Sequence, residues 1–169
     1  FSAWLADYAR THTKGQTRSV EKADEYLRRP EFRLELFRRV KGFLKAEFVK
    51  PGKACPIIGN RNDYHRAFMG RYISALELRL RHHPEAQCIA TNGPDTARAL
   101  LELSGFGYFL ETDHTAWDLH VAPYILKAIN HHYRKIFRVP TEDRVYFEAA
   151  LRSYLRTDWR FGFGVRYTL

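Results

Sequence analysis

The sequence predicts an α+β fold that is mostly helical and carries a few short antiparallel strands. Apolar residues recur at helical spacing through several long segments, which is typical of amphipathic helices. Short β-prone runs stand between Gly and Pro residues, which is typical of strands and turns. The 169 residues are 45% hydrophobic, enough for the packed core of one domain. Because the chain opens on Phe1 and ends on the β-prone Leu169, we expect it to be a piece of a longer protein.

The first half is predicted to place a strand pair between helices. Residues 20–29 form a short helix that Pro30 ends, and residues 31–43 form an amphipathic helix with Arg and Lys on its polar side. Residues 44–49 and 55–59 then form two short strands around the Pro-Gly pair at 51–52. We expect the two strands to make a hairpin-like finger that carries lysines.

The second half is predicted to hold longer helices with short strands between them. Apolar spacing predicts helices over residues 65–81, 95–103, 121–136 and 143–155, and strands over 88–90, 108–112 and 165–169. Pro123 is compatible with the first turn of its helix, where its missing N–H costs nothing. Helix dominates, and we expect the few strands to need partners outside this segment.

The charge is uneven along the chain. The net charge is +9, and residues 1–86 hold 18 Lys and Arg against 10 Asp and Glu, a balance of +8. Residues 87–169 hold 10 against 9, a balance of +1. A solvated surface explains part of this excess, since Lys and Arg are mostly exposed in any protein. The concentration in one half favours a surface that binds a polyanion.

Cysteine and histidine usage points away from disulfide and zinc frameworks. The only cysteines are Cys55 and Cys88, with no C-x-x-C pair, so a reducing compartment is the default. The adjacent histidines at 82–83 and 131–132 would point about 100° apart on a helix and form no ready chelate. No apolar stretch has the length of a membrane span, and no signal-peptide pattern begins the chain.

Two carboxylates in the stretch from Gly107 to Val121 are the candidate catalytic residues. Asp113 ends a β-prone run on the same face as Glu111, and Asp118 follows through a turn where a helix begins. Two acids so placed suit a hard divalent cation and a phosphate-bearing substrate. The alternative is a strand-end acid beside an unrelated helix N-cap.

This stretch resembles motif A of the viral RNA-dependent RNA polymerases, most closely the tombusvirus-like plus-strand group. The matching residues are Asp113, Asp118, His120 and Val121. Upstream, Phe43, Lys45 and Glu47 resemble the FxKxE segment of the family's fingers, followed by an R…Y…GRY…LE element over residues 61–77. The chain ends on residues 164–169, which resemble the strand that runs into motif B. The elements keep the family's order and cover residues 40–169.

The resemblance implies a fold, a reaction and a set of partners. Residues 1–90 would be a basic fingers segment with a motif F-like part at 43–61, and residues 91–169 a palm segment with motif A at 107–121. The reaction would be RNA-directed RNA synthesis by two-metal nucleotidyl transfer, with Mg²⁺ or Mn²⁺ as cofactor. The partners would be RNA template, primer or nascent strand, nucleoside triphosphates and the rest of the polymerase chain. The implied location is the host cytoplasm, at membrane-associated replication complexes reached through other regions of the protein.

The same resemblance assigns roles to single residues. Asp113 would coordinate the metal directly, and Asp118 would bind the ribose 2′-hydroxyl of the incoming nucleotide. Trp117 and His120 would anchor the turn by packing. This segment alone would be inactive, because the acids of motif C would lie further along the chain.

Basic residues of the finger are the candidates for binding the triphosphate, whose charge grows on the leaving pyrophosphate. These are Lys45, Lys50, Lys53 and Arg61. The family usually carries Pro-Arg in this stretch, whereas this chain reads Cys55-Pro56. Lys53 or Arg61 takes over that role, or the segment shifts its register, or nucleotide binding is weaker.

Two other functions remain open. A basic RNA-binding or interaction module on a polymerase-like scaffold would keep the charge without the catalysis, and the missing arginine at position 56 favours it. An unrelated Mg²⁺-dependent enzyme that handles phosphates would use Asp113 and Asp118. Aromatic residues that alternate with charge, as in residues 158–161, either stack on bases or belong to the core.

Overall fold

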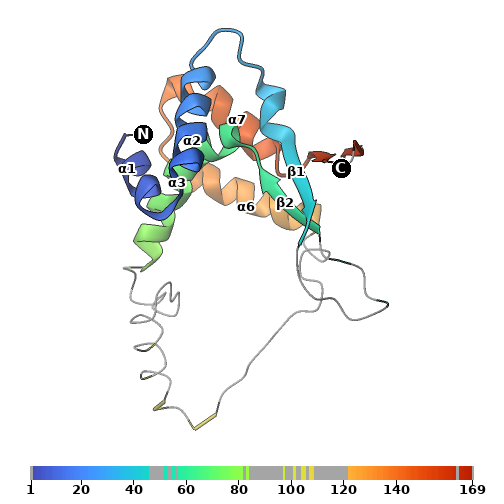
Figure 1. The fold of residues 1–169 in the computed structure, drawn as a ribbon. Coiled ribbons are helices and arrows are strands. Elements are labelled where there is room, and N and C mark those ends of the chain that lie inside the picture. Colours follow the sequence, from blue (N-terminus) through green and yellow to red (C-terminus); the bar gives the residue numbers. More distant parts are fainter. Residues whose placement is uncertain are drawn as a thin grey trace. The chain divides into compact units, whose positions relative to one another are not determined.

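The computed structural model confirms the α+β class (Figure 1). It describes residues 2–45, 52, 55, 57–81, 83, 97, 101, 104–105, 107–108, 122–162 and 164–168. The chain divides into two compact units, one of residues 1–71 with 123–169 and one of residues 72–122. The first unit holds every element that positions the candidate site.

Two helices open the first unit. Helix α1 spans Ser2–Thr11 and α2 spans Lys14–Leu27, which begins earlier than the predicted start at residue 20. Thr13 and Gln16 form a capping box at the start of α2, because each side chain bonds the other residue's backbone N–H. Helix α2 buries Val20, Ala23 and Leu27 on one face.

The predicted helix over residues 31–43 is wrong. The chain instead makes the short 3₁₀-helix η1, Leu34–Arg38, and then strand β1, Arg39–Leu44. The apolar residues Leu36, Phe37 and Val40 fit a helical period as well as a turn followed by a strand. Pairing of β1 with two neighbouring strands decides between the two, since such tertiary contacts override local propensity.

The later elements follow the predicted order. Helix α3 spans Asp63–Arg81, α6 spans Pro123–Ile136 with Pro123 in its first turn, and α7 spans Arg144–Arg152 after the 3₁₀-helix η3, Thr141–Asp143. The predicted helices over 65–81, 121–136 and 143–155 are thereby confirmed with small shifts of their ends. Of the predicted elements at 88–90, 95–103 and 108–112, the structure describes only residues 97, 101 and 108, so these three predictions stay untested.

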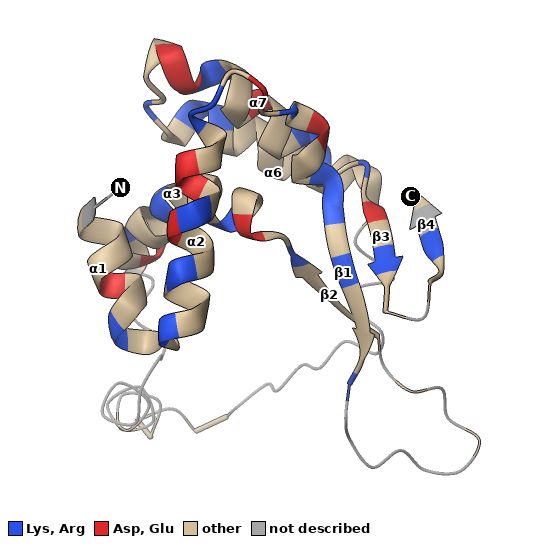
Figure 2. Ribbon diagram, turned by 45° about the horizontal axis from the view of Figure 1, so that its top comes forward, with Lys and Arg blue, Asp and Glu red and all other residues tan. Residues whose placement is uncertain are grey.

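One four-stranded sheet gathers the described strands in the order β2-β1-β3-β4. Strand β2 is Ile57–Arg61, β3 is Asp158–Phe161 and β4 is Arg166–Thr168. The pairs β1–β2 and β3–β4 are antiparallel, whereas β1 and β3 run parallel. Strand β3 was not predicted, and the expectation that the strands need outside partners is wrong for these four. Figure 2 shows β1, β3 and β4 lying side by side.

The core of this unit is built mainly from side chains of α2, η1, the first half of α3, and α7. Phe37, Met69 and Leu151 are fully buried. Aromatic rings surround them, with Phe32 in contact with Phe37, Tyr64 and Tyr146 at centroid distances of 5.4 to 5.9 Å. Such edge-to-face and tilted contacts add to the stabilisation from burial.

Two residues of the GRY element have packing roles in the first unit. Gly70 lies against the indole of Trp4, and a Cβ there would come within 2.3 Å of the ring. Arg71 Nη2 bonds Asp143 Oδ2 at 2.6 Å and so ties α3 to η3.

Within the described part of the chain, no helix is both long and apolar enough to cross a membrane.

Candidate nucleic-acid interface

The predicted lysine finger is an antiparallel hairpin of β1 and β2. The register runs from Val40 opposite Arg61 to Leu44 opposite Ile57, so Lys45 leaves the sheet directly after the last pair. An antiparallel strand pair in this part of the chain is confirmed, but its first strand occupies residues 39–44 rather than 44–49, and its second occupies residues 57–61 rather than 55–59. Within the connection, Gly52 has a φ of +84°, a conformation that glycine adopts without strain.

Asn62 joins the hairpin to the helices. Its Nδ2 donates to the carbonyl oxygens of Leu36 and Arg39, the latter at 2.9 Å. Its Oδ1 accepts from the backbone N–H of His65 at 2.9 Å and thereby caps the start of α3. One side chain thus holds the base of the finger against both η1 and α3.

Arg61 turns inward at the base of the finger. Its Nη1 donates to the carbonyl oxygen of Ser153 at 3.0 Å and to the Ser153 hydroxyl at 3.3 Å. The guanidinium lies over the Tyr154 ring, 4.9 Å from the centroid. Burial lowers the pKa of Arg61 and raises the pKa of Tyr154 to about 12. The cation therefore links β2 to the end of α7.

His65 lies beside this link and is only 5% exposed. Its ring packs edge-on against Tyr154 at a centroid distance of 5.1 Å. Its Nε2 has no hydrogen-bond partner within the part of the chain that the structure describes. Burial, reinforced by the charges of Arg61 and Arg66, lowers the pKa of His65 to about 3. The imidazole is neutral at physiological pH.

One face of the sheet pairs glycines with aromatic rings. A Cβ on Gly42 would lie 2.3 Å from the Phe161 ring, and a Cβ on Gly59 would lie 2.3 Å from the Trp159 ring. The two rings stack on each other with centroids 6.1 Å apart. The aromatics of residues 158–161 therefore cover strands β1 and β2, and the residues that alternate with them, Asp158 and Arg160, point to the opposite face.

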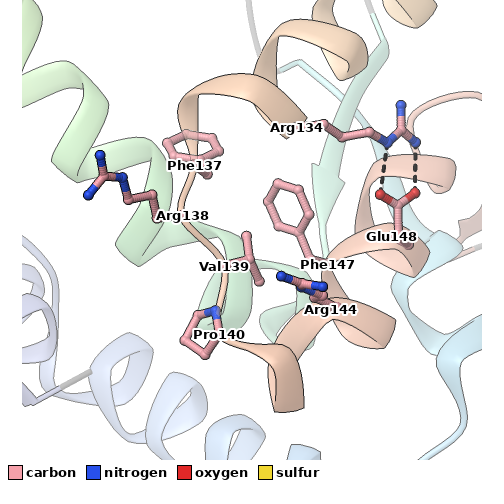
Figure 3. A pocket seen from close by; sticks show the side chains of 8 residues that line it. All are labelled: Arg134, Phe137, Arg138, Val139, Pro140, Arg144, Phe147 and Glu148. Carbon is pink, nitrogen blue, oxygen red and sulfur yellow. Dashed lines mark hydrogen bonds and ion pairs between the residues drawn. The ribbon is translucent and has the colours of Figure 1, made fainter.

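A basic pocket of about 610 Å³ lies between α6 and α7 (Figure 3). Phe137, Val139, Pro140 and Phe147 supply apolar walls, and Arg138 and Arg144 stand at its sides. Arg134 donates two hydrogen bonds of 2.8 Å to Glu148, which hold the pKa of that carboxyl below its usual value. Sequence reasoning missed this pocket, because its residues meet only through the turn between the helices.

The structure describes two of the predicted site residues, Lys45 and Arg61, and does not bring them together. Lys45 and Arg61 stand at opposite ends of the hairpin strands. Asp113, Asp118, Lys50 and Lys53 lie outside the described residues. Within the described ranges, no group of His, Cys, Asp and Glu forms a candidate metal site. The metal and triphosphate assignments stay predictions.

Comparison with family models, with curated proteins and with solved structures found no match to this chain.

Proposed function

We propose that the chain is a fingers-and-palm segment of an RNA-directed RNA polymerase that copies a viral RNA genome. The observation that carries the proposal is the hairpin of β1 and β2, whose connection holds the lysines of the motif F-like segment. This basic finger precedes the acid pair Asp113 and Asp118 in the order typical of the family that the sequence resembles.

The finger and the acid pair would divide the chemistry between them. Lys45, Lys50 and Lys53 offer positive charge to a template strand or a triphosphate. Asp113 would hold Mg²⁺ or Mn²⁺, which when bound supplies activation of the primer hydroxyl and stabilisation of the leaving phosphate. Asp118 would accept a hydrogen bond from the ribose 2′-hydroxyl and so select ribonucleotides.

The contacts of Arg61 favour a positioning role for this residue over direct contact with the triphosphate. Its Nη1 already bonds Ser153, and its guanidinium covers Tyr154. In that position it would hold the base of the finger at a set angle to α7. The arginine missing at position 56 is then replaced by lysines of the finger, and we expect weaker, more salt-sensitive binding of the triphosphate.

A test uses the longer polymerase chain that the resemblance implies and follows extension of a primed RNA by GTP and dGTP. We expect Asp113→Asn to lower incorporation by several orders of magnitude, because metal-derived stabilisation of the transition state is lost. Asp118→Asn should keep measurable activity and narrow the preference for GTP. Full activity of Asp113→Asn would refute the metal assignment, and an unchanged sugar preference of Asp118→Asn would refute the role of that residue.

A non-catalytic RNA-binding module on the same scaffold is the second candidate. The inward placement of Arg61 together with Pro56 favours it, since both remove an arginine from the expected triphosphate site. The two functions differ in one measurement. The module binds RNA with the same affinity whether or not Asp113 is intact, and its longer chain incorporates no nucleotide.

A further inference from the structure

A row of three cations crosses the sheet on the face opposite the glycine–aromatic pairs. Lys41 of β1 is in register with Arg160 of β3, which is in register with Arg166 of β4. Residues in register point to the same face of a sheet. All three side chains are exposed, and Figure 2 shows basic segments on each of these strands. We call Lys41, Arg160 and Arg166 the cationic row.

The sheet does not neutralise this row. Like charges on directly opposed strand positions repel one another. Within the described ranges, the ion pairs of the chain include none of the three. The position of β2 in register with Lys41 is the uncharged Asn60. The neighbouring cross-strand pair on this face has opposite charges, because Arg39 of β1 is in register with Asp158 of β3. Binding of an external polyanion would relieve the repulsion within the row.

The surroundings of the row favour a nucleic-acid strand. Arg39, Lys41 and Arg160 line a hollow of about 330 Å³ together with Val40, Asn62, Phe161 and Gly162. Two residues beyond Lys41 on the same face, Phe43 is 42% exposed and in register with Ile58. A platform that binds a single strand has two parts. Its cations meet the phosphates, and its exposed aromatic ring stacks on a base. An acidic peptide needs the cations but has no use for the ring.

The spacing of the row also suits a phosphate backbone. Neighbouring strands lie about 4.8 Å apart, so the row spans roughly 10 Å. Each of the three cations can meet one phosphate of a strand that lies across the row, so roughly three phosphates fall within its reach. We propose that the cationic row and Phe43 bind single-stranded RNA, with the backbone across the row and a base on the ring. The choice of RNA rests on the proposed function, whereas the surface is separate from the finger lysines and from Asp113.

The test measures binding of a labelled single-stranded RNA of about 10 nucleotides by fluorescence anisotropy at several salt concentrations. The row variant K41Q/R160Q/R166Q should reduce the slope of log K against log salt by roughly 2, because about three phosphate contacts are lost. The matched control K14Q/R18Q/K22Q removes the same charge from exposed positions of α2 and should leave the slope nearly unchanged. Circular dichroism verifies that both variants fold.

Substitution of Phe43 allows a second test, in which the change in RNA affinity does not depend on charge. Phe43→Ala should weaken binding roughly five-fold to a hundred-fold at every salt concentration and keep the slope, since stacking carries no counterion release. Phe43→Tyr should retain the affinity. Equal slope changes in the row variant and the α2 control would overturn the proposal, because they would reflect net charge alone.

Further arms separate this proposal from its alternatives. Loss of binding to anionic lipid vesicles in the row variant, with RNA binding intact, would replace RNA by a membrane surface and overturn it. If the row variant binds RNA normally while K45A/K50A/K53A does not, the row proposal is wrong and the polymerase proposal stands. If the row is required while the longer chain with Asp113→Asn still incorporates nucleotides, the row proposal stands and the metal assignment fails.

Discussion

At the scale of single residues, the half-buried Arg61 and the buried His65 lie side by side at the base of the finger. Arg61 satisfies its charge through Ser153 and Tyr154, and His65 packs beside it as a neutral ring. A second cation next to Arg61 would be costly in this position, because burial and the neighbouring charges of Arg61 and Arg66 both disfavour the protonated imidazole. The site therefore holds the charged guanidinium of Arg61 and keeps the His65 imidazole neutral.

His65 makes folding stability depend on pH. Its pKa is about 3 when folded and near 6.5 when unfolded, so the unfolded chain binds more protons in this window. Stability is complete above pH 6.5 and is lost as the pH falls toward 3, at up to about 1.4 kcal/mol per pH unit. Urea unfolding of His65→Leu should lack this loss between pH 6.5 and 5, where Glu148 with its lowered pKa stays ionised. A parallel pH dependence of wild type and variant would contradict the prediction.

At the scale of elements, the sheet depends on glycines that let aromatic rings approach the backbone. Gly42 and Gly59 sit under Phe161 and Trp159, and these contacts connect the hairpin to β3. An isolated two-stranded hairpin is marginally stable in water, so the pairing with β3 is what supports the finger. The aromatic pair thus supports the rigidity of the hairpin.

Adding a methyl group at Gly59 should destabilise the sheet. Gly59→Ala places a Cβ where the Trp159 ring stands, and overpacking of this kind costs about 1 to 3 kcal/mol. Gly15→Ala is the matched control, because nothing lies closer to its Cβ than the Thr13 hydroxyl at 4.0 Å, and it should be neutral or stabilising by about 0.5 kcal/mol. Chemical denaturation measures both. In a Trp159→Ala background the cost of Gly59→Ala should largely disappear, and an unchanged cost there would contradict the ring contact.

At the scale of the whole molecule, the uneven charge of the chain predicts that its binding of RNA depends strongly on salt. The balance of +8 in residues 1–86 includes the finger lysines, and Lys45 marks the point where the finger leaves the sheet. Binding of single-stranded RNA should fall steeply between low and physiological salt, because phosphate contacts release counterions. Electrophoretic mobility shifts of wild type and K45A/K50A/K53A measure this, with the α2 variant K14Q/R18Q/K22Q as control. Flat salt dependence, or equal affinity of wild type and K45A/K50A/K53A, would contradict the prediction.

The sequence by itself determined the features that depend on local order. The amphipathic spacing of α3, α6 and α7 and the basic balance of the first half all follow from residues close together in the chain. Helical periodicity and turn residues act over a few positions, so a local pattern carries enough information to specify them.

Only the tertiary structure decided which distant segments meet. The pattern of residues 31–43 is compatible with helix or strand, and β1 forms because β3, from residues 158–161, pairs with it. The same pairing aligns Lys41 with Arg160, and the end of α7 draws Arg61 inward. These contacts join positions separated by about a hundred residues. Their energy comes from burial and hydrogen bonds across the fold, and no local pattern of side chains encodes which partner is chosen.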